Sequence, residues 1–96
     1  MRISFNRRVR TEVRRIADEY EDESPGVSDE FLAVLDQALD IIERHGTRMA
    51  KIRDEVRLVK LRRFPYGVYY QIEGDTARIL VVKHHRRDPN FGLDRT

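Results

Sequence analysis

Two basic clusters in the second half of the chain contain the side chains whose types could do chemistry. Their members are Arg62, Arg63, His84, His85, Arg86 and Arg87. Histidine titrates near neutral pH and can act as an acid or a base, and arginine binds phosphate and carboxylate. Cleavage of RNA without a metal needs such groups: a base for the 2′-hydroxyl, cations for the phosphorane and an acid for the leaving oxygen. The plainer alternatives are a histidine packed on a sheet end, an arginine paired with Asp88, and arginines that are only solvated.

Other kinds of active site are missing from the sequence. There is no cysteine, so no thiolate metal site, disulfide or cysteine nucleophile is possible. The five glycines are scattered, and neither a phosphate-binding loop nor an HExxH spacing occurs. We therefore expect no cofactor and no metal. No apolar run approaches the roughly 18 residues that span a bilayer, and the N-terminus lacks the apolar region of a signal peptide, so we expect a cytoplasmic protein that does not enter a membrane.

The charge is unevenly distributed along the 96 residues. The whole chain has 19 basic and 17 acidic residues, a net charge of +2. Residues 1–50 hold eight basic and eleven acidic residues, whereas residues 51–96 hold eleven basic and six acidic ones. This asymmetry indicates a localised positive face, which suits nucleic acid or an acidic protein segment as well as a merely solvated surface.

The first half of the chain must supply two helices. From Arg7 to Tyr20 the apolar residues recur at helical spacing. The acidic run 21–23 is unfavourable at a helix C-terminus, where we expect the helix to fray. A break at residues 24–26 precedes a second amphipathic helix, which starts either near Ser24 or near Ser28 and stops at Gly46. The short break predicts a helical hairpin.

The second half changes to strand periodicity, and the whole chain predicts a single α+β domain over residues 1–96. Segments 56–63, 67–72 and 77–83 predict an antiparallel sheet of three to four strands, with residues 3–5 as a possible short edge strand. The segment 77–83 is apolar on both faces, and the hairpin covers only one of them. The sheet could curl, a partner could complete the burial, or the apolar run could be only that of a central strand. We expect that a partner completes the burial. Residues 89–96 are expected to be a mobile tail.

Three motifs in this order resemble the RelE/ParE toxin superfamily. They are RRFPYGVYY at residues 62–70, ILVVKHHRRDP at residues 79–89, and the Ser24-Pro25 break before the helix that contains Phe31 and Leu35. The likeness extends over residues 3–88. It implies a compact α+β toxin of a type II toxin–antitoxin (plasmid-stabilisation) module, which arrests growth unless its cognate antitoxin binds it.

The resemblance leaves two target classes. RelE-like members cut mRNA in the ribosome, whereas ParE-like members inhibit DNA gyrase. In our alignment of the third-strand motif, Gly67 stands where an active nuclease would have an arginine, which favours the ParE-like branch and a non-enzymatic inhibitor. The alternative is a RelE-like endoribonuclease that uses His84 or His85 with Arg62, Arg63, Arg86 or Arg87. The candidate contacts of the antitoxin, whose binding segment we expect to be disordered alone, are Leu32, Leu39, Leu58 and Tyr69.

Overall fold

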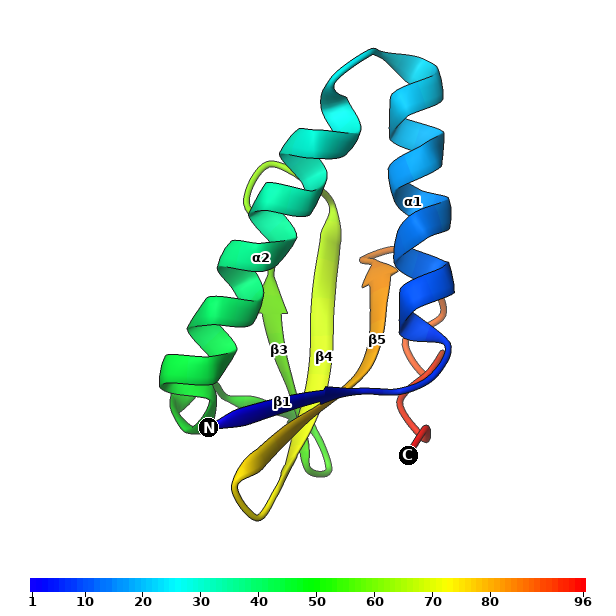
Figure 1. Cartoon of the computed structure of the whole chain (residues 1–96). Helices are drawn as coiled ribbons and strands as arrows, with labels where there is room; N and C mark the ends of the chain where they lie inside the picture. Colours follow the sequence, from blue (N-terminus) through cyan, green and yellow to red (C-terminus); the bar gives the residue numbers. More distant parts are fainter.

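Two helices form a hairpin across one face of the sheet. In the computed structural model, which describes all residues from 1 to 96, α1 spans Val9–Glu23 and α2 spans Val27–His45, followed by a short 3-10 turn, η1 (Gly46–Arg48). Both helices lie in front of the strands in Figure 1. The apolar stripe of α1 buries Val9, Ile16 and Ala17. Neither helix is both long and apolar enough to cross a bilayer.

The acidic end of α1 stays helical because one of its carboxylates caps the next helix. α2 begins at Val27, between the two predicted starts, and its N-cap is Gly26 at φ +89°. The Glu21 carboxylate accepts hydrogen bonds from the Gly26 N–H at 3.1 Å and from the Ser28 N–H and hydroxyl at 3.3 and 2.8 Å. These bonds satisfy donors that every helix N-terminus leaves free.

The α+β class is confirmed, but the sheet has five strands and mixed direction. The strands are β1 (Arg2–Phe5), β2 (Lys51–Arg53), β3 (Val56–Lys60), β4 (Tyr66–Glu73) and β5 (Thr76–His84). Their order is β1-β5-β4-β3-β2, and β1 runs parallel to β5 while the other pairs are antiparallel. The sequence did not predict β2, because its three residues are too few to show a periodicity. It did not predict the parallel direction of β1 either, because residues 6–75 separate the strands β1 and β5 and no local pattern fixes how two such distant strands pair.

The main core lies between the hairpin and the inner face of the sheet. Phe31, Ile42, Tyr70 and Ile79 are fully buried there. The Tyr70 hydroxyl donates to the Gly46 carbonyl oxygen at 2.8 Å, which joins β4 to the end of α2. Every buried side-chain nitrogen and oxygen atom has a hydrogen-bond partner, as is usual in folded proteins.

The outer face of the sheet is covered by the chain itself. Val56, Tyr69, Leu80 and Val81 form a second buried cluster, against which Leu58, Phe91 and Leu93 pack. We call residues 88–96, which supply two of these side chains, the strap; Figure 1 shows this last segment in red, folding back beside β5. The expectation that a partner has to complete the burial of this face is therefore wrong. The mobility of residues 89–96 stays a prediction.

Candidate functional site

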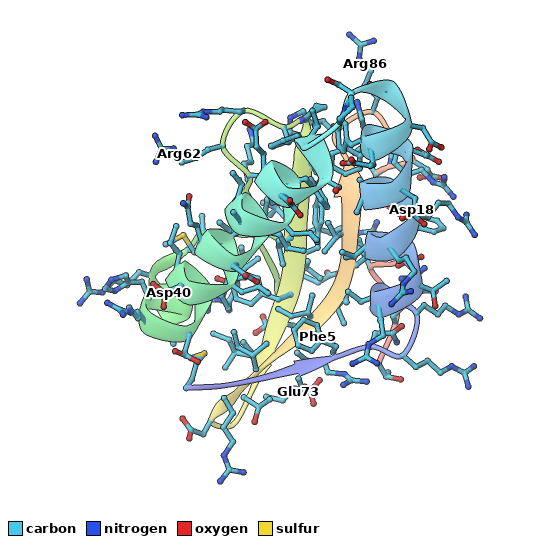
Figure 2. All side chains as sticks on the ribbon, turned by 45° about the horizontal axis from the view of Figure 1, so that its top comes forward. Phe5, Asp18, Asp40, Arg62, Glu73 and Arg86 are labelled. Atoms are coloured by element: carbon cyan, nitrogen blue, oxygen red, sulfur yellow. The ribbon has the colours of Figure 1, made fainter.

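An apolar groove opens where α1, α2 and β1 meet. Its volume is about 540 Å³, and its lining residues are Phe5, Asn6, Arg7, Val9, Arg10, Val13, Leu35 and Leu39. Leu35 and Val9 are buried, while Phe5 at the edge is 47% exposed. Figure 2 shows Phe5 on β1, between the two helices. The groove is apolar because Val9 and Val13 of α1 and Leu35 and Leu39 of α2 line it.

One rim of this groove is positively charged. Arg7 and Arg10 are exposed, and neither takes part in an ion pair. The ion pairs of the molecule lie elsewhere and join Arg44–Asp40, Lys51–Glu55, Arg53–Asp54 and Arg95–Glu12. The groove therefore combines an apolar floor with free guanidinium groups, a combination that suits an amphipathic segment carrying carboxylates.

The four predicted antitoxin contacts lie on two opposite sides of the molecule. Leu39 lines the groove, and Leu32, which is 40% exposed, lies seven residues earlier on the same stripe of α2. Leu58 and Tyr69 face each other across β3 and β4 on the outer side of the sheet, where Tyr69 is only 8% exposed. A partner that touches all four has to pass around the edge of the sheet.

Gly67 makes room for one of these contacts. A Cβ atom placed on Gly67 would lie 2.5 Å from Leu58 Cδ1, so the Leu58 side chain fills the space that an arginine would need. Gly67, which aligns with the nuclease arginine, supplies no cation. The space beside it is occupied by an apolar side chain from the neighbouring strand.

His84 lies at the inner side of the sheet end, among carboxylates and phenols. Its ring is 5.2 Å from that of Tyr66, and its Nδ1 accepts a hydrogen bond from the Arg86 N–H at 3.0 Å. His84 and Tyr66 line a hollow of about 210 Å³ together with the carboxylates Glu19 and Glu23. Burial raises the pKa of Tyr66, and the two carboxylates raise this pKa further. His84 thus has acidic neighbours in this hollow, whereas Arg15, Lys83 and Arg87 line a second hollow beside it.

Of the predicted arginines only Arg87 shares a hollow with His84, and Arg15 and Lys83 line that hollow too. Arg62 and Arg63 lie exposed in the turn between β3 and β4, and Figure 2 shows Arg62 and Arg86 pointing into solvent in different directions. The Arg87 guanidinium lies over the Phe91 ring, 3.9 Å from its centroid. His85 is exposed beside His84, with the two rings 5.9 Å apart. The six residues thus occupy one end of the molecule without surrounding one cavity.

The sequence interpretation missed Lys83, the most buried cation. Lys83 is 4% exposed, and its Nζ donates to the carbonyl oxygens of Asp88, Pro89 and Phe91 at 3.0, 2.9 and 2.9 Å. Burial lowers the pKa of Lys83, against the opposite effect of Asp88. A lysine at the end of an otherwise apolar strand was the available signal. All three donors are used to hold the strap, and no group of three or more ligating side chains could hold a metal.

A two-helix hairpin on a small sheet agrees with the compact α+β fold that the resemblance to the RelE/ParE toxin superfamily implies. The sequence model of the ParE toxin of the parDE type II toxin–antitoxin system matches residues 3–89. The chain belongs to the ParE toxin family. The resemblance read from the motifs at residues 62–70 and 79–89 is confirmed.

A solved structure shows the same fold. A chain of the chromosomal ParDE TA system from P. aeruginosa superposes with a TM-score of 0.77, covering 88% of this chain and 95% of that one. The two sequences are 17% identical, so the likeness concerns the fold alone. No curated protein sequence matches the chain.

Proposed function

We propose that this ParE-family toxin arrests growth by binding DNA gyrase, without chemistry of its own, and that a cognate antitoxin neutralises it. The observation that carries the binding mechanism is the separation of the groups a nuclease needs. His84 faces Glu19 and Glu23 on the inner side of the sheet, whereas Arg62 and Arg86 point into solvent away from it. Transition-state stabilisation requires donors already placed around the reacting phosphate.

The groove between α1, α2 and β1 is the proposed antitoxin site. Its occupant is a segment of the antitoxin that is disordered alone and folds on binding. Apolar side chains of this segment lie on Val13, Leu35 and Leu39, and its carboxylates face Arg7 and Arg10. Leu58 is partly exposed. Contact with the Tyr69 side chain requires the strap to move, because Tyr69 is buried in the cluster against which Phe91 and Leu93 pack.

The second candidate function is a RelE-like ribosome-dependent endoribonuclease. It is favoured by one observation: an imidazole, two phenols and two carboxylates share the hollow at the end of α1. Such groups can transfer protons. Cations for the phosphorane could come from Arg15 and Arg87, which line a neighbouring hollow together with His84.

One experiment separates the two functions. Freshly induced protein is added to a translating extract and, separately, to a gyrase supercoiling reaction. Under the proposal mRNA stays intact and supercoiling stops. Fragments cut within mRNA codons, with supercoiling unaffected, would establish the nuclease and overturn the proposal.

A further inference from the structure

α1 carries its charges against its own dipole. Five arginines at and just before its beginning form what we call the arginine ridge, namely Arg7, the N-cap Arg8, Arg10, Arg14 and Arg15. The last turns of α1 hold Asp18, Glu19, Glu21, Asp22 and Glu23. A helix N-terminus is electropositive and its C-terminus electronegative, so both halves are placed unfavourably. α2 has the favourable arrangement, with Asp29 and Glu30 in its first turn and Arg44 and His45 in its last.

Folding does not explain the ridge. All five guanidinium groups belong to exposed residues, and none forms an ion pair. Arg14 and Asp18 have the spacing of a helical ion pair, yet they do not form one. The single acid within the ridge, Glu12, is engaged by Arg95. In Figure 2, nitrogen-tipped side chains spread outward from the lower turns of α1, below Asp18. A charge arrangement that costs stability and has no internal partner points to an external one.

The linear density of positive charge along the ridge is of the same order as the density of negative charge along a DNA duplex. Residues 7–15 cover about 12 Å of helix axis at about 1.5 Å per residue, so the ridge presents roughly one positive charge every 2–3 Å. Double-stranded DNA carries one negative charge per about 1.7 Å of its axis. Arg7 and Arg8 also line, with Arg78, Arg95 and one acid, Asp94, a hollow of about 470 Å³ that has no apolar side chain. Basic side chains outnumber the acid there, so the positive field extends beyond the helix.

The surroundings favour a phosphate backbone over unpaired bases. Proteins that hold single strands stack successive bases on aromatic rings, but Phe5 is the only exposed aromatic residue. Guanidinium groups bind phosphate oxygens in a bidentate manner, whatever the base sequence. We propose that the arginine ridge binds the phosphate backbone of double-stranded DNA without reading its sequence.

This surface overlaps the proposed antitoxin groove. Arg7 and Arg10 belong to both. If the groove is the antitoxin site, a bound antitoxin segment therefore excludes the duplex from this part of the ridge. The DNA test below uses the toxin alone, so its result is independent of the antitoxin and of gyrase.

The test measures binding of the full chain to a 30-base-pair duplex of arbitrary sequence by fluorescence anisotropy. With five phosphate contacts, affinity should fall about 500-fold between 50 and 200 mM salt. Duplex RNA and single-stranded DNA of the same length are separate arms, and both should bind more weakly. Preference for either of them would overturn the assignment to duplex DNA, as would undetectable duplex binding at 50 mM salt.

Two charge-matched variants locate the surface. Arg10→Glu with Arg14→Glu should weaken duplex binding roughly 50-fold at 100 mM salt and lower the salt slope by about two. It should also raise Tm, because it places acids near the helix N-terminus, so lost binding cannot be ascribed to unfolding. Arg44→Glu with Arg48→Glu, in the last turn of α2 and in η1, changes the net charge equally and should bind like the parent chain. If both double variants lose the same affinity for the duplex, binding depends on net charge alone and the proposal is overturned.

Discussion

The Arg95 guanidinium forms a bidentate ion pair with the Glu12 carboxylate, with two nitrogen–oxygen distances of 2.7 Å, and so connects the end of the strap to α1. Arg95 also donates to the Leu80 carbonyl oxygen at 3.2 Å. Its side chain is 9% exposed and that of Glu12 23%. The hydrogen bond to Glu12 raises the pKa of Arg95, so the guanidinium stays charged. The strap is thereby held over the outer cluster of the sheet.

Removal of one member of this pair should destabilise the protein. Glu12→Gln leaves a shielded guanidinium without its charge partner, and we expect a loss of about 1–3 kcal/mol in the free energy of unfolding. Asp40→Asn breaks the exposed pair with Arg44 and should cost below about 0.5 kcal/mol. Urea denaturation measures both. Equal small losses would contradict a fastening role for Arg95.

Gly92 should not tolerate a side chain. Its φ is +78°, and a Cβ atom would lie 2.7 Å from Val81 Cβ. Gly92→Ala should therefore cost about 2–4 kcal/mol, or detach the strap and expose the outer cluster. Gly74→Ala is the control, because Gly74 has φ +61° but open space around it, so only the backbone cost of about 1–2 kcal/mol remains. Thermal unfolding with a dye for exposed apolar surface distinguishes the outcomes.

The Glu21 cap should make the hairpin sensitive to acid. Hydrogen bonds from the Ser28 side chain, then from the Gly26 and Ser28 N–H groups, lower the pKa of Glu21. A lowered folded-state pKa means that the cap stabilises the protein above the ordinary Glu pKa of about 4.3 and loses this effect as the pH falls through the lowered value.

Glu21→Gln should accordingly be less stable than the parent chain at pH 7, and the difference should vanish in strong acid. Asp22→Asn, next to it and exposed, should show no such pH-dependent difference. Unfolding followed by circular dichroism from pH 7 to pH 3 is the measurement. A difference that persists unchanged at pH 3 would mean that Glu21 acts other than as an ionised cap.

An exposed aromatic side chain at the groove should contribute to antitoxin affinity. Phe5→Ser removes apolar surface from the groove edge, and we expect affinity to fall roughly tenfold or more, as is typical of aromatic interface contacts. Ile52→Ser is the matched control, because Ile52 is 48% exposed on β2, away from the groove. Calorimetric titration with the cognate antitoxin tests both. An effect of Ile52→Ser as large as that of Phe5→Ser would place the partner elsewhere.

Growth arrest should not depend on the two adjacent histidines. Under the binding mechanism, His84→Ala and His85→Ala leave arrest unchanged, because neither imidazole performs chemistry. Plating efficiency after induction is the readout, with circular dichroism to confirm folding. Lost arrest in a folded variant would favour proton transfer by the removed histidine, and therefore the nuclease.

Much of the fold could be predicted because its signals are local. The apolar stripe from Val9 to Tyr20, the stop at Gly46 and the strand patterns after residue 56 each reflect a repeat within a few residues. The candidate site was predicted less well. Leu39, predicted from its helical spacing, lines the groove, whereas Leu32 does not. Phe5 and Val13, which complete the groove, have no spacing that connects them.

The sequence by itself determined the two helices, the central strands and the family, because periodicity and motif order survive without any knowledge of long-range contacts. Only the tertiary structure decided that the outer face is covered by the chain's own last residues. The Arg95–Glu12 contact joins positions 83 residues apart, and Gly92 fits only against Val81. Such complementarity depends on where the backbone brings distant side chains together, and no local pattern encodes that position.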